Sequence, residues 1–118
     1  MNRVNIMGRL TADPELKKTP NNISVTSFTI AQGKNEKTQF LDCVAWRNTA
    51  EFIVKHFSKG RMIAIDGSLQ TRTWEDRNGS KHKAVEIIVN EVDFADSQKP
   101  QEKPQEIPQE ELSDDLPF

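Results

Sequence analysis

The sequence predicts an all-β domain of five short strands with one helix between the third and the fourth strand, followed by a disordered tail. Apolar side chains alternate over short stretches, most clearly in residues 40–46, which is the period of a half-buried strand. Residues 48–57 have helical spacing instead. From Asp96 onward the tripeptide Pro-Gln-Glu recurs three times. Such a composition buries too little apolar surface to form a core.

The first two strands are predicted from alternation with one interruption each. In residues 4–10 the alternation of apolar side chains continues until Gly8 interrupts it. In residues 23–30 the alternation slips once between Val25 and Phe28. A slip of this kind predicts a β-bulge in the second strand.

The helix follows the third strand. The side chain of Asn48 can cap its first turn, with Glu51 three residues later as the reciprocal partner. Gly60 is expected to end the helix. One face of the helix is apolar and is expected to pack on the sheet; it consists of Ala50, Ile53, Val54 and Phe57.

Two longer strands complete the domain. The fourth, residues 63–74, contains Gly67, where a kink is expected. Asn78-Gly79 is typical of a hairpin turn, and the returning strand runs through residues 85–89. Three strands, a helix and two strands are the order of an OB-fold, a five-stranded Greek-key barrel that binds oligonucleotides. Other small barrels share this strand count.

The predicted domain ends near residue 95, where the balance of charge changes sign. Residues 1–95 contain 14 Lys and Arg and 11 Asp and Glu, a balance of +3, whereas residues 96–118 balance at −5. We therefore expect an OB-fold binding domain at 1–95 and a disordered Pro/Gln/Glu-rich linker at 96–111. An acidic tip at 112–118 follows the linker.

The tip has the chemistry of a partner-binding peptide. Apolar side chains return there behind two carboxylates, in the order Asp114, Asp115, Leu116, Pro117, Phe118. A ring at a free chain end can enter a pocket while the aspartates meet its basic rim. The alternative is a tail that only improves solubility. Because its charge resembles that of phosphate, the tip is also expected to compete with a nucleic acid for the domain.

Large aromatic residues are the candidate ligand platforms. Phe40 and Trp46 lie opposite the small apolar side of the third strand, and Trp74 shares a side of the fourth strand with Arg72. If these sides face outward, unpaired bases can stack on the rings beside a guanidinium that holds phosphate. Alternatively, the rings pack in the core beneath the helix. Asp42 shares their side, and burying an unpaired carboxylate is costly, which argues against that alternative.

Basic residues are spread along the domain. Any one of them is an ordinary solvated side chain when taken alone. Together, the two hairpins can form a basic rim beside the aromatic strands. The predicted phosphate contacts are Arg3, Arg9, Lys34, Lys37, Arg47, Arg72, Arg77 and Lys83.

Several segments, in this order and with these gaps, resemble the bacterial and phage single-stranded DNA-binding protein family along nearly the whole chain. They are Asn2-Arg3-Val4, Gly8-Arg9-Leu10-Thr11, Asp13-Pro14-Glu15-Leu16, Phe40-Leu41-Asp42-Cys43-Val44-Ala45-Trp46, Lys59-Gly60, Gly67-Ser68-Leu69-Gln70-Thr71-Arg72-Thr73-Trp74, Glu86-Ile87-Ile88-Val89 and the terminal Asp114-Asp115-Leu116-Pro117-Phe118. Two departures stand out: the hairpin between the second and third strands, residues 32–37, lacks the aromatic residue that many members carry, and the linker is short and Pro-Gln-Glu-rich rather than Gly-rich.

The resemblance implies an OB-fold, a homotetramer and sequence-independent binding of single-stranded DNA. It places Phe40, Trp46 and Trp74 at base-stacking positions and puts Arg3 and Arg72 on the DNA path. It implies that the first strand contributes to a dimer contact. It further implies recruitment of replication, recombination and repair proteins through the tip. The cytoplasm is the expected compartment, in association with the nucleoid, or the host cytoplasm if a phage encodes the chain.

Enzymatic chemistry is not indicated. Cys43 is the single cysteine, which excludes an intrachain disulfide and fits a reducing compartment. His56 and His82 are the only histidines, and no metal-binding or phosphate-cradling motif accompanies them. We expect no catalytic residue, no metal and no cofactor. The remaining alternative is an OB-fold module that binds proteins, such as a primosome accessory factor, and has lost strong DNA binding.

Overall fold

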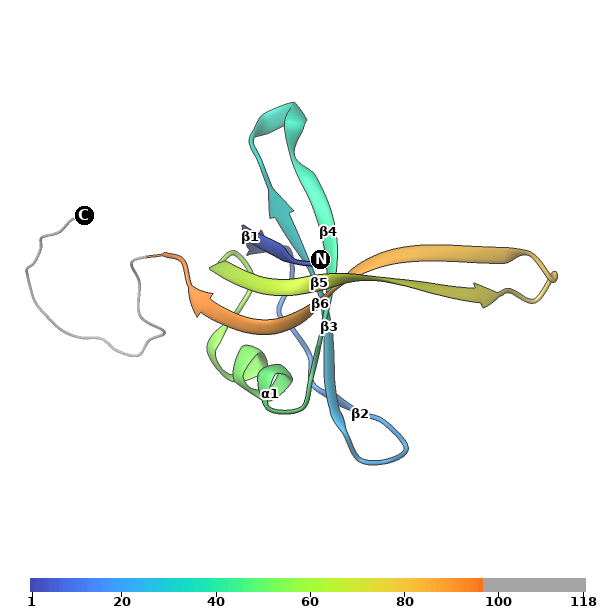
Figure 1. The fold of residues 1–118 in the computed structure, drawn as a ribbon. Coiled ribbons are helices and arrows are strands. Elements are labelled where there is room, and N and C mark those ends of the chain that lie inside the picture. The colour runs from blue at the N-terminus through green and yellow to red at the C-terminus, as the bar shows by residue number, and fades with distance from the viewer. Residues whose placement is uncertain (97–118) are drawn as a thin grey trace, which may run out of the picture.

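The computed structural model describes residues 1–96, and the predicted linker and tip, apart from Asp96, lie outside the described residues. The elements are β1 (Val4–Leu10), β2 (Lys17–Lys18), β3 (Ser24–Gln32), the 3-10 turn η1 (Asn35–Lys37), β4 (Gln39–Trp46), α1 (Arg47–His56), β5 (Met62–Glu75) and β6 (Lys81–Phe94). Figure 1 shows a curved sheet with α1 below it, from which the β3–β4 hairpin projects upward and the β5–β6 hairpin to the right. None of the helices in residues 1–96 is long and apolar enough to cross a bilayer.

The sheet closes on itself. Its strands are hydrogen-bonded in the order β1-β5-β6-β4-β3-β2, and β1 also pairs with β3. The β4–β6 pair is parallel, whereas the other pairs are antiparallel. Five long strands and a helix between β4 and β5 are the predicted OB-fold arrangement, so the fold class is confirmed. The two-residue β2 at the edge is an addition that alternation in the sequence did not indicate.

The inward side chains of the long strands and one face of α1 form the core. Alternation along each strand sends one set of residues inward, and most of these residues are apolar. Ala50, Ile53 and Phe57 cover one end of the sheet from α1 and its C-cap, as predicted. The buried strand residues of the core are Leu10, Phe28, Ile30, Cys43, Ala45, Ile63, Ile65, Ile87 and Val89.

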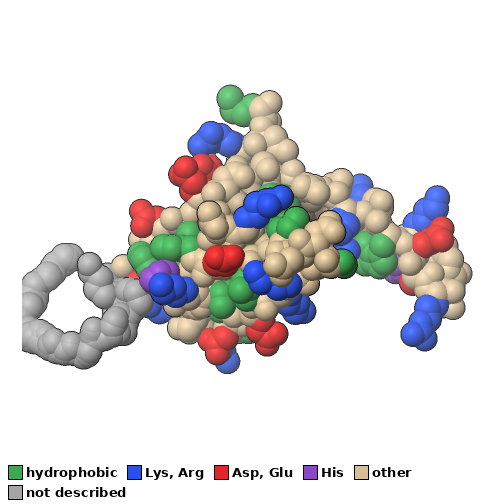
Figure 2. Space-filling model, turned by 90° about the horizontal axis from the view of Figure 1, so that it is seen from below, with side chains coloured by type: hydrophobic (Ala, Val, Ile, Leu, Met, Phe, Trp, Pro, Cys, Tyr) green, Lys and Arg blue, Asp and Glu red, His purple; other side chains and the backbone are tan. Residues whose placement is uncertain are grey.

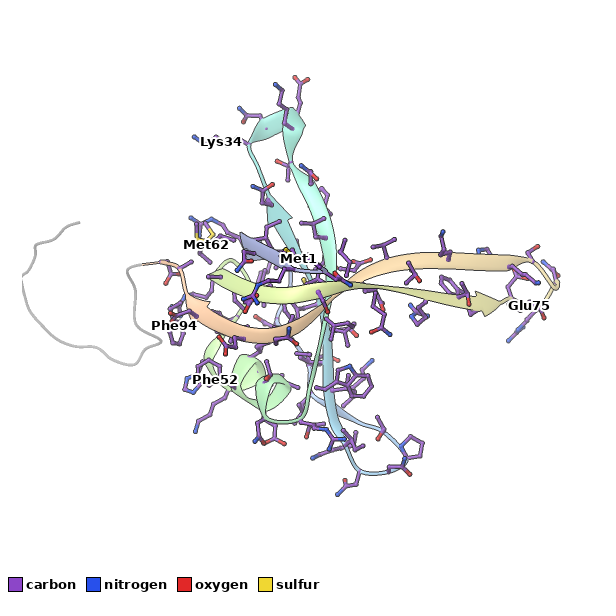
Figure 3. All side chains as sticks on the ribbon, viewed as in Figure 1. Met1, Lys34, Phe52, Met62, Glu75 and Phe94 are labelled. Atoms are coloured by element: carbon purple, nitrogen blue, oxygen red, sulfur yellow. The ribbon has the colours of Figure 1, made fainter. Side chains whose placement is uncertain are left out.

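Phe52, which the apolar face of the helix did not include, belongs to an aromatic cluster at the end of the domain. Its ring centroid lies 4.5 Å from that of His56 and 6.0 Å from that of Phe94. Figure 3 shows Phe52 and Phe94 on neighbouring elements, α1 and β6. Phe94 also stacks on Phe57 at 4.8 Å. The cluster therefore attaches the end of β6 to the helix.

The predicted bulge in the second strand is wrong. β3 pairs with β4 without interruption from Val25 opposite Trp46 to Gln32 opposite Gln39. The apparent slip arises because two inward positions hold polar residues, Ser24 and Thr26. The hydroxyl of Ser24 is satisfied, since it donates to Glu51 Oε2 at 2.7 Å and accepts from Lys18 at 2.8 Å.

The expected kink at Gly67 is confirmed. The register of β5 against β6 shifts between Asp66 and Gly67. A Cβ atom on Gly67 would lie 2.2 Å from the carbonyl oxygen of Ile88. Only glycine allows the two backbones to approach this closely, so the kink is where β5 leaves the closed sheet and enters the projecting hairpin.

The predicted N-cap at Asn48 is also wrong. The helix begins at Arg47, with Trp46 at the N-cap position two residues before the predicted cap, and it has no side-chain capping bond. Arg47 has a φ of 60°, so the chain turns from β4 into α1 within one residue. Glu51 bonds Ser24 instead of the helix terminus. The helix ends at His56, before Gly60.

Candidate nucleic-acid interface

The three candidate stacking rings are all exposed on the domain. The exposed fraction is 67% for Phe40 and 42% for both Trp46 and Trp74. The residues that fill the core beneath the helix are different ones, as described above. The alternative that these three rings pack in the core is therefore wrong.

On β4, strand register explains why the rings point outward. Cys43 of β4 pairs with Ile87 of β6, and both side chains are buried. Successive side chains on a strand alternate between faces. Phe40 and Trp46 each lie three residues from Cys43, so both occupy the outer face. Asp42 shares this face, where its Oδ1 accepts a hydrogen bond from Thr29 Oγ1 at 2.9 Å.

The same reasoning places Trp74 on the outer face. Leu69 of β5 pairs with Ile87, and Trp74 lies five residues further along β5. Trp74 pairs with His82 across the hairpin. The outer surface of β4, β6 and β5 therefore carries all three rings, although the sheet bends strongly between β4 and the β5–β6 hairpin (Figure 1).

A row of contacting side chains runs along the β5–β6 hairpin on this face. We call it the arm row; it consists of Glu86, Arg72, Trp74, His82 and Asp76. Arg72 pairs with Glu86 at 3.3 Å and lies over the Trp74 ring, with its Cζ 4.7 Å from the ring centroid. The other end of the row links Trp74 to the hairpin turn. The rings of Trp74 and His82 stack at 5.3 Å with an interplanar angle of 21°, and His82 Nε2 lies 2.8 Å from Asp76 Oδ2.

The predicted basic residues are distributed around the rings rather than gathered in one patch. Figure 2 shows basic and acidic side chains next to one another over the visible face and at the tip of the β5–β6 hairpin. Arg9 of β1 pairs with Ala31 of β3, which pairs with Phe40, so Arg9 lies on the same row of the outer face. Arg3 is bound to Asp66 at 3.1 Å, which offsets its charge.

The remaining basic residues lie at hairpin ends or strand ends. Lys34 and Lys37 flank and end η1 at the tip of the β3–β4 hairpin, where Figure 3 labels Lys34. Arg47 follows Trp46 directly. Arg77 lies in the turn of the β5–β6 hairpin. Lys83 pairs with Thr73, and both side chains lie on the face of the hairpin opposite Trp74. Arg72 therefore lies over a ring and Arg47 is the chain neighbour of one, whereas Lys34, Lys37 and Arg77 lie at the two hairpin tips.

Sequence reasoning missed His82, Asp76 and Glu86 as parts of this surface. Asp76 organises the turn: its Oδ1 accepts from the backbone N–H groups of Asn78 and Ser80, both at 2.9 Å. The hydrogen bond from His82, together with those backbone bonds, lowers the pKa of the Asp76 carboxyl below its ordinary value. The dipeptide Asn78-Gly79 predicted the hairpin but not its register. The register is what pairs His82 with Trp74 across the two strands.

The thiol of Cys43 is buried in the core. Burial first, and then the nearby Asp42 charge, raises the pKa of the Cys43 thiol to about 12, which keeps it protonated and poorly nucleophilic. Within residues 1–96, no group of three or more His, Cys, Asp or Glu side chains is placed to hold a metal ion. The chemistry available on the surface is stacking, ion pairing and hydrogen bonding.

A closed OB-fold sheet with exposed rings and flanking cations defines a class of small β domains that bind oligonucleotides. Residues 1–95 match the model of the Single-strand binding protein family. The chain therefore belongs to that family, whose members are DNA-binding proteins and not enzymes, in agreement with the prediction.

Individual relatives show the same likeness. A "Single-stranded DNA-binding protein" of Caldanaerobacter subterraneus subsp. tengcongensis is 39% identical over 101 residues, which cover 80% of this chain and 67% of the relative. Another, from Bacillus cereus, is 40% identical over 102 residues, which cover 80% of this chain and 59% of the relative. "Single-stranded DNA-binding protein A" of Bacillus subtilis is 39% identical with the same coverage. The aligned region thus spans about three-fifths to two-thirds of these relatives.

Proposed function

We propose that this chain binds single-stranded DNA without sequence preference by stacking unpaired bases on Phe40, Trp46 and Trp74. The single observation that carries the proposal is the exposure of these three rings on the outer face of β4 and of the β5–β6 hairpin that continues from the closed sheet. Stacking suits any base because every base has a π-face, and each stacked base contributes about 1–3 kcal/mol. The names of the relatives support the same ligand.

Cations around the rings supply the phosphate contacts in this proposal. The strand would pass Arg72 and Arg47, which adjoin Trp74 and Trp46, and reach the two hairpin tips. The full set of proposed phosphate contacts is Arg3, Arg9, Lys34, Lys37, Arg47, Arg72, Arg77 and Lys83. Because Arg3 and Arg72 are paired with Asp66 and Glu86, they would exchange a carboxylate for a phosphate on binding.

Titration of oligo(dT) against tryptophan fluorescence tests the binding proposal. We expect strong quenching that weakens as salt increases, with a slope near −0.7 per phosphate neutralised on a single strand. A duplex of equal length is the control and should bind far more weakly, because its bases are already stacked. Absence of quenching at low salt would instead favour an OB-fold module that binds proteins.

The proposal extends to recruitment of partners through the tip. Asp114, Asp115, Leu116, Pro117 and Phe118 would bind replication, recombination and repair proteins while residues 1–95 hold the strand. The test compares the full chain with a chain lacking residues 112–118. We expect the shortened chain to gain affinity for DNA at low salt, since an acidic competitor is gone; unchanged or weaker affinity would contradict the competition. The shortened chain should also no longer retain partner proteins on immobilised DNA; unchanged retention would contradict the role of the tip.

Assembly into a homotetramer is a further part of the proposal. The outer face of β1 carries Met7, which is 59% exposed, above Ala64 of β5. An exposed apolar side chain on this strand supports the contact between copies that the resemblance implies. Sedimentation equilibrium of the wild type and of Met7→Glu tests it. We expect a tetramer for the wild type and smaller species for the variant, and a monomeric wild type would contradict the assembly.

A further inference from the structure

His82 holds the Trp74 ring from across the hairpin. The two side chains are directly paired in the register of β5 and β6, and their rings stack at 5.3 Å with a 21° interplanar angle. His82 is held in turn by Asp76, with Nε2 2.8 Å from Oδ2. The ring that would receive a base is thus supported by a side chain whose own position is set by the turn.

The contact with Asp76 decides which nitrogen of His82 carries the proton. An ionised carboxylate only accepts hydrogen bonds, so the nitrogen facing it, Nε2, must be the donor. In the neutral imidazole, Nδ1 is then left with a lone pair and no hydrogen. Protonation adds a hydrogen to Nδ1 without disturbing the bond to Asp76, and turns a group that repels phosphate into one that donates to it.

The charges around His82 come from both strands and the turn. Glu75 and Asp76 are acidic, whereas Arg77, Lys81 and Lys83 are basic, and Arg72 lies over the Trp74 ring. The tip, residues 75–83, therefore has a balance of +1, and protonation of His82 raises it to +2. Beside these groups lies an open groove of about 530 Å³, lined by Thr73, Trp74, Glu75, Lys81, His82 and Lys83.

We infer that His82 is a positioning residue for the base-stacking ring of Trp74 and that it makes the affinity for single-stranded DNA increase as the pH falls. This inference rests on the proposed function. When protonated, the imidazolium stacks on the indole as a cation and brings one further positive charge to the strand. The neutral ring supports Trp74 but offers no cation.

The chain contains only two histidines, which provides a matched control. Affinity for oligo(dT) is measured between pH 5.5 and 8.0 for the wild type, His82→Phe and His56→Gln. Phenylalanine preserves an aromatic ring beside Trp74 but has no proton to gain. His56 lies on α1 in the aromatic cluster with Phe52, away from the arm row.

We expect the wild type and His56→Gln to bind about two- to fivefold more tightly at pH 5.5 than at pH 8.0. Their salt slope should be steeper at pH 5.5 by about 0.7, the value for one further phosphate neutralised. Both changes should be absent in His82→Phe. A His82→Phe variant with the pH dependence of the wild type, or a wild type that binds equally well at both pH values, overturns the inference and leaves the proposed function standing.

A second measurement needs no DNA. In Trp46→Phe, Trp74 is the only tryptophan, so its fluorescence reports directly on its neighbour. We expect this fluorescence to fall as the pH is lowered from 8.0 to 5.5, because an imidazolium in contact quenches an indole. The fall should be lost when His82→Phe is added. An unchanged signal in Trp46→Phe contradicts the contact, whereas failure of the wild type to bind oligo(dT) at any pH contradicts the proposed function itself.

Discussion

The two faces of β4 differ in the size and the solvent exposure of their side chains. On the inner face, Cys43 and Ala45 are 1% and 0% exposed and fit against a crowded core. On the outer face, Phe40 and Trp46 leave much of their apolar surface in water. Small residues inside and large rings outside reverse the arrangement that stability alone would favour, since burying a large ring contributes more than burying alanine. The outer rings are therefore better explained by a ligand than by folding.

The largest expected effect is a loss of folding stability when a side chain of the inner face is shortened. Ile30→Ala removes a fully buried side chain from the inner face of β3. We expect it to lower the free energy of unfolding by about 2–5 kcal/mol, through lost burial and the cavity left behind. Urea denaturation measures this change. Under conditions where the variant is folded, its affinity for oligo(dT) should match that of the wild type; a large loss of affinity there would break the distinction between the faces.

A change on the outer face should have the opposite profile. Trp46→Ala is expected to weaken binding to oligo(dT) by about 1–3 kcal/mol, because one stacking platform is lost. Its free energy of unfolding should change little, by about 0.5 kcal/mol or less, as for other surface positions. Isothermal titration calorimetry and urea denaturation check the two halves. The distinction fails if the variant unfolds readily but binds as the wild type does.

The inner face should also respond to alkaline pH. The raised pKa of Cys43 means that folding disfavours its thiolate, so the associated stability is fully present below pH 9 and is lost as the pH rises towards about 12. We expect the free energy of unfolding to fall by about 1 kcal/mol between pH 9 and 10 from this group. Cys43→Ala is the control that removes this component. Rapid labelling of the native thiol by a disulfide reagent at pH 8 would contradict its burial.

The smallest expected effect concerns the charge next to Arg72. Glu86→Gln removes the carboxylate that pairs with Arg72 at 3.3 Å. Because the Arg72 side chain of this pair is largely exposed to solvent, stability should change little. The affinity for oligo(dT) should rise by about two- to threefold, since Arg72 no longer exchanges one anion for another. Fluorescence titration at fixed salt measures it, and a weaker variant would show that Glu86 orients Arg72 for binding.

Alternation, helical spacing and turn residues were enough to predict the closed sheet, the helix and the outward side of β4. They failed where a polar residue occupies an inward position, as Ser24 and Thr26 do in β3. The helix start was missed because a single left-handed residue, Arg47, makes the turn out of β4. Neither feature has a periodic signature, and the inward hydroxyl of Ser24 is satisfied by Glu51, which is distant in the sequence.

The sequence was enough to predict which aromatic rings of the candidate site face outward. It was not enough to predict the contacts of the arm row. Phe40, Trp46 and Trp74 follow from the parity of their strands. The arm row depends on register: Asp76 and Ser80 close the turn, with Gly79 at a φ of 82°, so the loop between them has three residues. A two-residue Asn78-Gly79 loop would have placed Lys83, not His82, opposite Trp74. One residue of register thus decides which side chain supports the ring.

The central claim, that unpaired bases stack on this outer face, is tested most directly by giving the chain one tryptophan at a time. Trp74→Phe leaves Trp46 as the only fluorophore, and Trp46→Phe leaves Trp74. Iodide quenching of each variant is measured with and without saturating oligo(dT). Both indoles should be quenched by the DNA and then become inaccessible to iodide. A variant that binds oligo(dT) while its remaining tryptophan stays open to iodide would remove that ring from the DNA path and contradict the claim.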